Sequence, residues 1–166
     1  MIILQDSREQ HPLSFKSLPA PPKVEVITLA TGDYSIKGFE RLVCLERKSI
    51  ADLTNTLVRN VSAKGPEKGR FSRELERMKE YKYAAIIVEG TVRDILNHKY
   101  RSLIAPRSIL GMLSYIWVGV GVPTFWCDDA EASAEVVYSM FKQIFKRENK
   151  LAQESKTDSK GCDSPG

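Results

Sequence analysis

The chain has 166 residues, of which 42% are hydrophobic and 28% are charged, and its formal net charge is +4. This length suits one domain with a hydrophobic core and excludes two substantial domains, and the composition is ordinary for a soluble globular protein. No apolar run reaches the length of a membrane span, and the first residues lack the features of a signal peptide. We therefore expect no membrane contact and an intracellular protein, cytoplasmic in a prokaryote or virus and nuclear in a eukaryote.

The first part of the chain predicts strands. Apolar or alternating runs at 1–4, 24–29, 33–36 and 42–48 are typical of strands, and the last two are expected to form a hairpin. Ser49 then caps a helix whose apolar residues fall on one side.

Helices and strands alternate in the rest of the chain. A loop is expected at 63–69, followed by a helix at 71–81. Residues 84–88 are wholly apolar, as in a strand buried on both faces. Further helices are expected from Thr91 and from Pro106.

The last predicted elements are a strand at 122–126 and a helix that Asp129 caps and that ends near Lys146. The residues beyond have too little apolar content to fold, so we expect a domain at 1–148 and a disordered tail at 149–166. Strands grouped first and then alternating with helices predict an α/β fold, a three-layer sandwich with a mixed central sheet.

Two carboxylates and a lysine on neighbouring segments form a candidate site. Glu46 and Lys48 project from one face of a strand, where they are expensive to bury unless they pair or bind something. Asp33 follows a glycine, which allows a close approach of backbone. Asp33 and Glu46 suit Mg2+ or Mn2+ held against a phosphodiester, with the Arg47 carbonyl as a further ligand. Lys48 would stabilise charge on the phosphate, and the alternative for Glu46 and Lys48 is a surface ion pair on an edge strand.

A longer pattern adds to this interpretation. Gly32-Asp33-Tyr34, then Glu46-Arg47-Lys48 and then Asp52 resemble, in this order, the signature of the XPF family of structure-specific DNA endonucleases. Similar matches lie upstream in Asp6-Ser7-Arg8-Glu9 and downstream in Gly69-Arg70-Phe71. The resemblance covers roughly residues 1–147, with one departure at Glu74, where the family often has glutamine.

The resemblance implies a restriction-endonuclease-like fold and a metal-dependent endonuclease. Its substrate would be branched or structured DNA, such as a fork, flap or junction, cut during DNA repair or recombination. The implied catalytic residues are Asp33, Glu46, Lys48, Asp6, Arg47 and Asp52. For Asp52, a place in the first turn of a helix, where the dipole favours a carboxylate, is the alternative explanation. A tandem helix-hairpin-helix domain, common in the family, does not fit after Glu148, so we expect a nuclease domain alone.

Basic side chains gather at residues 59–82, where eight basic residues stand against four acidic ones. Three of them recur at helical spacing and line one face, which suits contacts to DNA phosphates: Arg70, Arg73 and Arg77. An ordinary solvated helix face is the alternative. Arg8 directly follows Asp6, where a strand end meets the turn at Asp33, and is a further candidate DNA-binding residue.

Two other functions stay open. A non-catalytic DNA-binding or scaffold partner of a heterodimeric nuclease has the same fold, but such relatives usually lose a site residue, and this chain keeps all of them. A sequence-specific restriction enzyme shares the fold and the metal chemistry, but no obvious base-reading insertion is present. We therefore expect an enzyme whose partner is DNA.

Two helices carry apolar stripes that are wider than one side of a sheet needs, at 109–118 and 136–145. Exposed apolar surface of that size usually marks an interface, and XPF-like nuclease domains pair through this end of the fold. We therefore expect a homodimer, with a thick helical layer that is all core as the alternative. Trp117 and Trp126 lie in apolar surroundings and are expected in the core.

Overall fold

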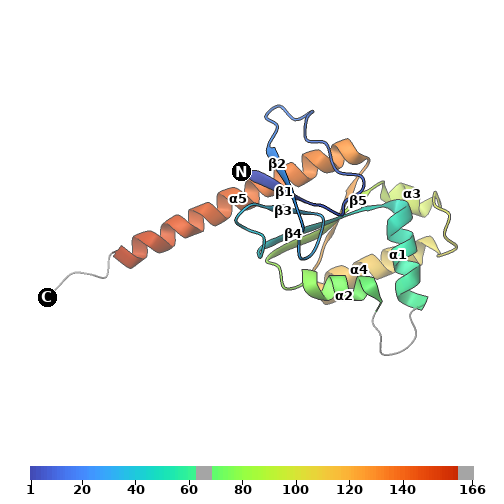
Figure 1. The fold of residues 1–166 in the computed structure, drawn as a ribbon. Coiled ribbons are helices and arrows are strands. Elements are labelled where there is room, and N and C mark those ends of the chain that lie inside the picture. The colour runs from blue at the N-terminus through green and yellow to red at the C-terminus, as the bar shows by residue number, and fades with distance from the viewer. Residues whose placement is uncertain (63–68, 161–166) are drawn as a thin grey trace.

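The computed structural model describes residues 1–62 and 69–160. The predicted loop at 63–69 lies outside these ranges apart from Gly69, as do residues 161–166. The elements follow the predicted order, with a π-helical turn added after α4 (Figure 1). They are β1 (Ile2–Asp6), β2 (Lys23–Ile27), β3 (Tyr34–Ile36), β4 (Val43–Ser49), α1 (Ile50–Ser62), α2 (Arg70–Met78), β5 (Tyr83–Glu89), α3 (Val92–Leu96), α4 (Pro106–Tyr115), η1 (Ile116–Val120), β6 (Thr124–Cys127) and α5 (Ala130–Lys160).

The strands form one six-stranded mixed sheet in the order β2-β1-β3-β4-β5-β6. β1 pairs in parallel with β2, and β4, β5 and β6 pair in parallel in turn. β3 lies antiparallel between β1 and β4, so within the described sheet β3 alone runs against the other strands. The carboxyl ends of β1, β4 and β5 and the amino end of β3 therefore meet at one end of the sheet.

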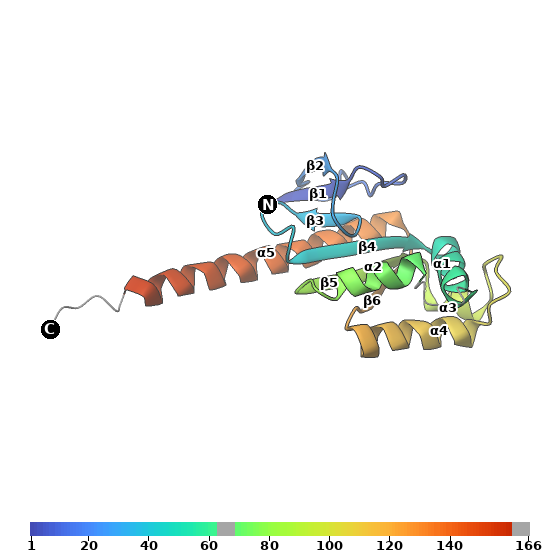
Figure 2. The same ribbon diagram turned by 60° about the horizontal axis from the view of Figure 1, so that its bottom comes forward.

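Helices cover both faces of this sheet. Because side chains alternate along a strand, Val43 and Leu45 of β4 share a core cluster with Phe141 of α5. Cys44, between them, belongs to a second cluster on the opposite face, together with Leu53 of α1 and residues of α2 and α4. In Figure 2, α2 and α4 lie in front of the sheet and α5 lies behind it. This arrangement confirms the predicted three-layer α/β sandwich.

Local signals in the sequence produce the predicted turns and caps. The Ser49 hydroxyl accepts a hydrogen bond from the Asp52 N–H at 3.1 Å, and the Asp129 carboxylate accepts one from the Ala132 N–H at 2.8 Å. Both interactions satisfy amide groups that the first turn of a helix leaves without a partner. The start of α1 and the start of α5 are therefore confirmed.

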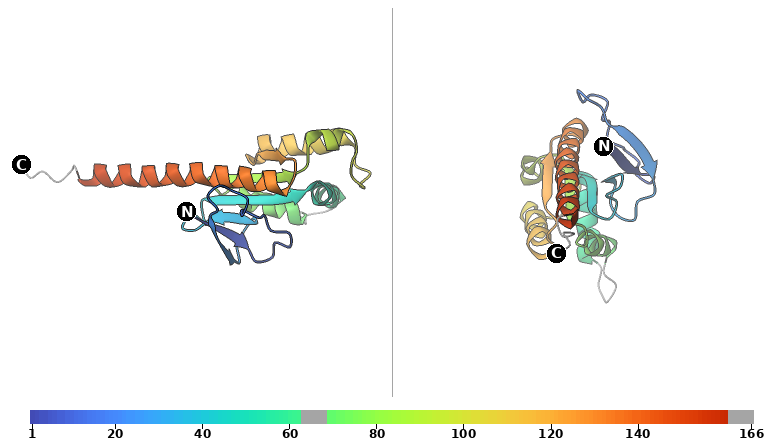
Figure 3. Two further views of the ribbon diagram at one scale, coloured as in Figure 1. Left: turned by 90° about the horizontal axis from the view of Figure 1, so that it is seen from above. Right: turned by 90° about the vertical axis from the view of Figure 1, so that its left-hand side faces the viewer.

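The final helix is longer than the sequence indicated. The predicted end was near Lys146 with disorder from residue 149, but α5 continues to Lys160 and projects beyond the body of the protein (Figure 3). Residues 150–155 are all exposed, so burial does not hold this part in place. Good helix formers and the pair Lys150–Glu154, 3.6 Å apart, support it instead. The division into a domain at 1–148 and a tail stays a prediction.

Trp117 was expected in the core but lies on the surface just after α4. The buried side of this helix is formed by Ile109, Leu113 and Ile116, and the next residue around the helix points away from them. Trp117 is accordingly 62% exposed, whereas Trp126 packs against the core as expected. Within residues 1–62 and 69–160, none of the helices combines the length and the apolar character that crossing a membrane requires.

Candidate active site

The predicted site residues gather at the end of the sheet where β1, β4 and β5 finish. Asp33, just before β3, is joined to both neighbouring strands through its backbone. The Asp6 N–H donates to the Asp33 carbonyl at 2.8 Å, and the Asp33 N–H donates to the Leu45 carbonyl at 2.8 Å. The Asp33 carboxylate also accepts a hydrogen bond from the Arg47 N–H at 2.8 Å. These bonds fix Asp33 beside the end of β4.

Gly32 allows this close approach, as the sequence predicted. Its φ of +76° lies in the left-handed region, which side chains other than glycine rarely adopt. A Cβ atom there would meet the Cys44 Sγ at 2.7 Å and the Leu45 carbonyl oxygen at 2.9 Å. A larger residue would therefore push Asp33 away from β4.

Glu46 and Lys48 form a buried pair on the face that α1 and α2 cover. The Lys48 Nζ lies 2.5 Å from Glu46 Oε1, and the two side chains are only 8–9% exposed. The same ammonium lies 5.2 Å from the ring centroid of Phe71 and 3.9 Å from an Oε atom of Glu74, both on α2. β4 lies between β3 and β5 in the sheet. The alternative of a surface ion pair on an edge strand is therefore wrong.

Burial is the main influence on the protonation of the carboxyl groups in this cluster. Burial raises the pKa of Asp33 to about 6. Burial also raises the pKa of Glu46 above its ordinary value, with Lys48 opposing the shift and Asp33 adding to it. Burial alone lowers the pKa of Lys48, but the charges of Glu46 and Glu74 raise it overall, so the proton stays on the ammonium. The cluster is thus suited to binding a further cation.

The donor set fits a hard divalent cation. In the described part of the chain, no three or more metal-binding side chains converge on one point. A metal here would therefore be held by Asp33 and Glu46 together with water and phosphate oxygens, which is how Mg2+ usually binds. The raised pKa values of both carboxyl groups support this fit, because a cation would offset the burial that disfavours their charged forms.

Arg47 points to the opposite face of the sheet, as alternation along β4 requires. Its guanidinium donates twice to the Glu89 carboxylate at 2.5 Å and once to Glu9 at 3.4 Å. The Arg47 side chain is 12% exposed, so this is a buried ion cluster. Arg47 reaches the site through its backbone N–H to Asp33, and a direct catalytic role for its side chain stays a prediction. Glu89 was missed, although a glutamate that ends an apolar strand run was a usable signal.

The Asp6 carboxylate is bonded mainly to Arg8. Its side chain is 2% exposed and accepts hydrogen bonds from the Arg8 Nε at 2.7 Å and Nη2 at 2.8 Å. The backbone N–H groups of Arg8 and Leu29 donate to it as well. These bonds, led by those from the Arg8 side chain, lower the pKa of Asp6. Arg8 itself is 66% exposed beside the site, as a DNA-contacting residue should be.

Asp52 is exposed in the first turn of α1. Its carboxylate accepts a hydrogen bond from the Ser49 hydroxyl at 2.7 Å, so the helix-start alternative accounts for its contacts. Its catalytic role stays a prediction.

A groove of about 290 Å3 leads to the buried pair. Its lining consists of Glu46, Lys48, Thr56, Arg59, Arg70, Phe71 and Glu74. Arg70 therefore stands beside the site as predicted, and Arg59 of α1, which the prediction did not single out, stands there too. Arg73 is exposed on α2, whereas the Arg77 Nε donates to the Thr31 hydroxyl at 3.3 Å, near Asp33.

Comparisons with known proteins agree with this geometry. The ERCC4 domain family matches residues 5–140. XPF from Aeropyrum pernix has a similar structure, with a TM-score of 0.66 and 21% identity, covering 100% of this chain and 76% of that chain. XPF from Aeropyrum pernix in complex with DNA is also similar, with a TM-score of 0.63 and 23% identity, covering 88% of this chain and 66% of that one.

No curated protein sequence matches the chain. The structural likenesses confirm the restriction-endonuclease-like fold, and the family match confirms the resemblance drawn from the Gly-Asp-Tyr and Glu-Arg-Lys segments. Because the match spans most of the chain, this protein belongs to the ERCC4 domain family.

Proposed function

We propose that this protein is a divalent-metal-dependent endonuclease that hydrolyses phosphodiester bonds in branched or structured DNA. The observation that carries the proposal is the buried Glu46–Lys48 pair beside Asp33, on the floor of a groove lined by Arg59 and Arg70. The arginines attract DNA phosphates, while uncompensated carboxylates would repel them. Asp33 and Glu46 could hold a divalent cation, which would offset this repulsion and allow a phosphate to approach the carboxylates.

The residues divide the chemistry among them. Asp33 and Glu46 would hold Mg2+ or Mn2+, which when bound polarises the phosphate and lowers the pKa of a bound water. Lys48 presents its ammonium at the floor of the groove, where it stabilises negative charge developing on the phosphate oxygens. The Arg47 N–H keeps the Asp33 carboxylate in place, and Arg70 holds the DNA backbone.

DNA with a branch is the proposed substrate, and repair or recombination is the proposed setting. One similar structure, XPF from Aeropyrum pernix, is of a complex with DNA, which supports DNA as the ligand. Exposed Arg8 follows β1 and the arginines of α2 come from a separate element, so we propose that the two sets contact different segments of the DNA. Forks, flaps and junctions offer such divergent segments.

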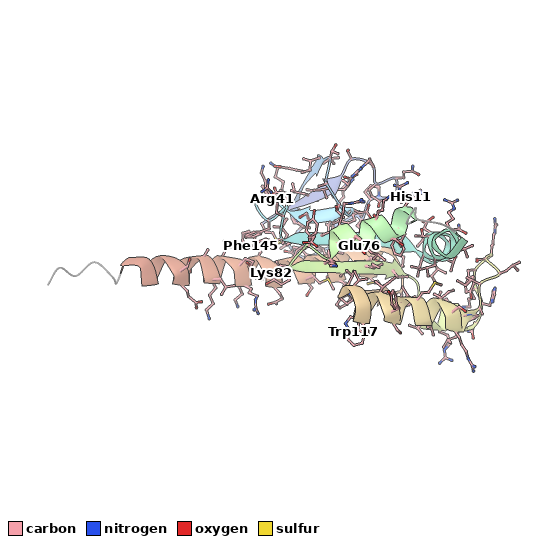
Figure 4. The ribbon with its side chains drawn as sticks, turned by 90° about the horizontal axis from the view of Figure 1, so that it is seen from below. His11, Arg41, Glu76, Lys82, Trp117 and Phe145 are labelled. Carbon is pink, nitrogen blue, oxygen red and sulfur yellow. The ribbon has the colours of Figure 1, made fainter. Side chains whose placement is uncertain are left out.

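We also propose that the protein is a homodimer, through the surface of α4, η1 and β6. The apolar side chains exposed there are Tyr115 (72%), Trp117 (62%), Val118 (79%) and Phe125 (41%). A neighbouring groove of about 450 Å3 is lined by Leu113, Trp117 and Trp126 among others. Figure 4 shows Trp117, in η1 just after α4, at the outer edge of the molecule. Several large apolar side chains exposed on neighbouring elements are typical of an interface.

The apolar stripe of α5 contributes less to such an interface than the sequence indicated. Val137 and Phe141 are completely buried, and Val136, Met140, Ile144 and Phe145 pack against the same core. For α5, the all-core alternative therefore fits better. Sedimentation of the wild-type protein and of Trp117→Asp at tens of micromolar tests the proposal, since a monomeric wild-type protein would exclude stable self-pairing.

The decisive test of the enzymatic function uses labelled duplex, flap, fork and four-way junction DNA with Mg2+, Mn2+ or EDTA. We expect cleavage of at least one branched substrate with either metal, none with EDTA, and none by the Glu46→Gln variant. Tight binding of branched DNA without cleavage under any condition would instead favour a non-catalytic scaffold.

A further inference from the structure

Lys48 has two carboxylates within reach, and they come from different elements. Glu46, on its own strand, lies 2.5 Å from the Nζ, and Glu74, on α2, lies 3.9 Å from it. Phe71, one helical turn before Glu74, places its ring 5.2 Å from the same ammonium. The ammonium is thus enclosed on the side of the groove by one helix face.

The contact with Glu46 conflicts with the role proposed for that residue. A divalent cation on Glu46 would stand beside the Lys48 ammonium and repel it, because like charges a few ångströms apart interact strongly in a poorly hydrated site. Lys48 is only 9% exposed, so losing its partner would leave a buried charge unpaired. Such a charge costs several kcal/mol.

Glu74 resolves this conflict. Its carboxylate is 20% exposed, points at the same ammonium and needs an approach of only about 1 Å to form a direct contact. Together, Asp33, Glu46 and Glu74 set three carboxylates against one ammonium, which leaves two formal negative charges, the complement of one divalent cation.

We propose that Glu74 is a positioning residue that takes over the Lys48 ammonium when Glu46 binds the metal. This inference rests on the proposed function. In this chain Glu74 therefore frees Glu46 for the cation and keeps Lys48 at the floor of the groove.

Direct binding of Mn2+ to the full chain without DNA, measured by calorimetry or electron paramagnetic resonance, tests the proposal. Glu74→Gln should weaken Mn2+ binding on the order of tenfold. Glu76→Gln is the matched control, because it removes the same charge from the same helix at a side chain that is 52% exposed and lies 3.7 Å from Lys79. The control should bind Mn2+ like the wild type. Equal affinities of Glu74→Gln and the wild type would overturn the proposal.

A double-mutant cycle with Lys48→Met tests whether Glu74 acts through Lys48. Once the ammonium is gone, Glu74→Gln should weaken Mn2+ binding by no more than about threefold. An undiminished effect would mean that Glu74 attracts the metal directly and would overturn the positioning role.

The Glu46→Gln variant separates this inference from the proposed function. If Glu46→Gln loses Mn2+ binding while Glu74→Gln keeps it, the metal site stands and the positioning role fails. If Glu46→Gln binds Mn2+ like the wild type, the proposed metal site itself is wrong. Thermal melts of each variant establish that it is folded.

Discussion

Consecutive residues of β4 build two buried charge clusters on opposite faces of the sheet, and the two clusters differ in how their charges are matched. On the α5 face, Arg47 makes a two-pronged contact with Glu89 and a longer one with Glu9. On the α1 and α2 face, Lys48 shares its single charge between Glu46 and Glu74, with Asp33 close by. In the first, matched cluster a planar donor faces a planar acceptor, whereas in the second, unmatched cluster one ammonium is shared among several carboxylates.

This difference suits the first cluster to holding the fold together and the second to binding a cation. A guanidinium whose donors meet a carboxylate in parallel has little reason to bind anything else. A set of carboxylates whose pKa values are raised by burial and mutual repulsion gains from any cation that enters. Residues one position apart on a strand thus serve different purposes because alternation sends them to different environments.

The largest expected effect is on catalysis at the unmatched cluster. Asp33→Asn, Glu46→Gln and Lys48→Ala should each lower the cleavage rate by at least about two to three orders of magnitude, since they remove metal ligands or charge stabilisation. DNA binding, measured by fluorescence anisotropy, should stay largely intact. A well-folded Glu46→Gln protein that cuts at the wild-type rate would show that the unmatched cluster is not the catalytic site.

Stability should respond most at the matched cluster. Glu89→Ala leaves Arg47 buried without its main partner and should lower the free energy of unfolding by about 3 kcal/mol, measured by urea denaturation. Replacing both residues with methionine should recover much of that loss, because no unpaired charge remains. Glu25→Ala is the control: its partners Lys23 and Lys37 are exposed, so the loss should be much smaller. A larger loss in Glu25→Ala would contradict the assignment.

Stability without metal should depend on pH through Asp33. Its pKa in the folded protein is about 6, above the ordinary value of 3.8. A carboxyl group with a raised pKa stabilises the fold below pH 4 and loses that contribution as the pH rises through about 6. In EDTA, the wild type should therefore lose about 2–3 kcal/mol relative to Asp33→Asn between pH 4 and pH 7. If the stability of the two proteins changed with pH in the same way, burial would not raise the pKa of Asp33.

Replacing the arginines of α2, beside the groove, should lower DNA affinity moderately. Charge reversal at Arg70, Arg73 and Arg77 together should weaken binding to all DNA structures about equally. Each lost phosphate contact lowers the slope of log affinity against log salt by about one. Because Arg77 is bonded to Thr31, its single replacement should have less effect than that of Arg70. An unchanged slope in the triple variant would place the DNA elsewhere.

The smallest effect is expected at the end of α5. Removing residues from Ala152 onward should leave folding and cleavage unchanged, because residues 152–155 are exposed and belong to neither charge cluster. Circular dichroism should show only the lost helix signal. A fall in cleavage rate would mean that this helix contacts DNA or a partner.

Strand periodicity predicted much of this site. The alternation along β4 placed Glu46 and Lys48 together, and Gly32 correctly indicated a close backbone approach. The partner of Arg47 was not predictable in the same way, because it depends on the register between β4 and β5, which pairs Ser49 with Glu89. The glutamate that ends the apolar run of β5 was visible in the sequence, but the register that brings it to Arg47 is set by tertiary packing.

Three further features were not predicted, for different physical reasons. The catalytic role expected for Asp6 stays a prediction, but its hydrogen bonds to Arg8 and Leu29 were not foreseen, because Leu29 is distant in the chain. The length of α5 was missed because an exposed helix needs no apolar periodicity, only residues with good helix propensity. Glu74 was visible as a departure from the family, yet its contact with Lys48 depends on how α2 packs.

The position of Asp33 links assembly of the site to the folding pathway. Its backbone bonds reach β1 on one side and β4 on the other, and these strands are separated by most of the first half of the domain. The carboxylate can reach its place only once β3 has been inserted between them, a step that closes long loops and is therefore late and slow. The amide protons of Asp6, Asp33 and Arg47 should then exchange with solvent only through global opening. If the proposed function holds, a partly folded chain should therefore not cleave DNA, because its site is not yet assembled.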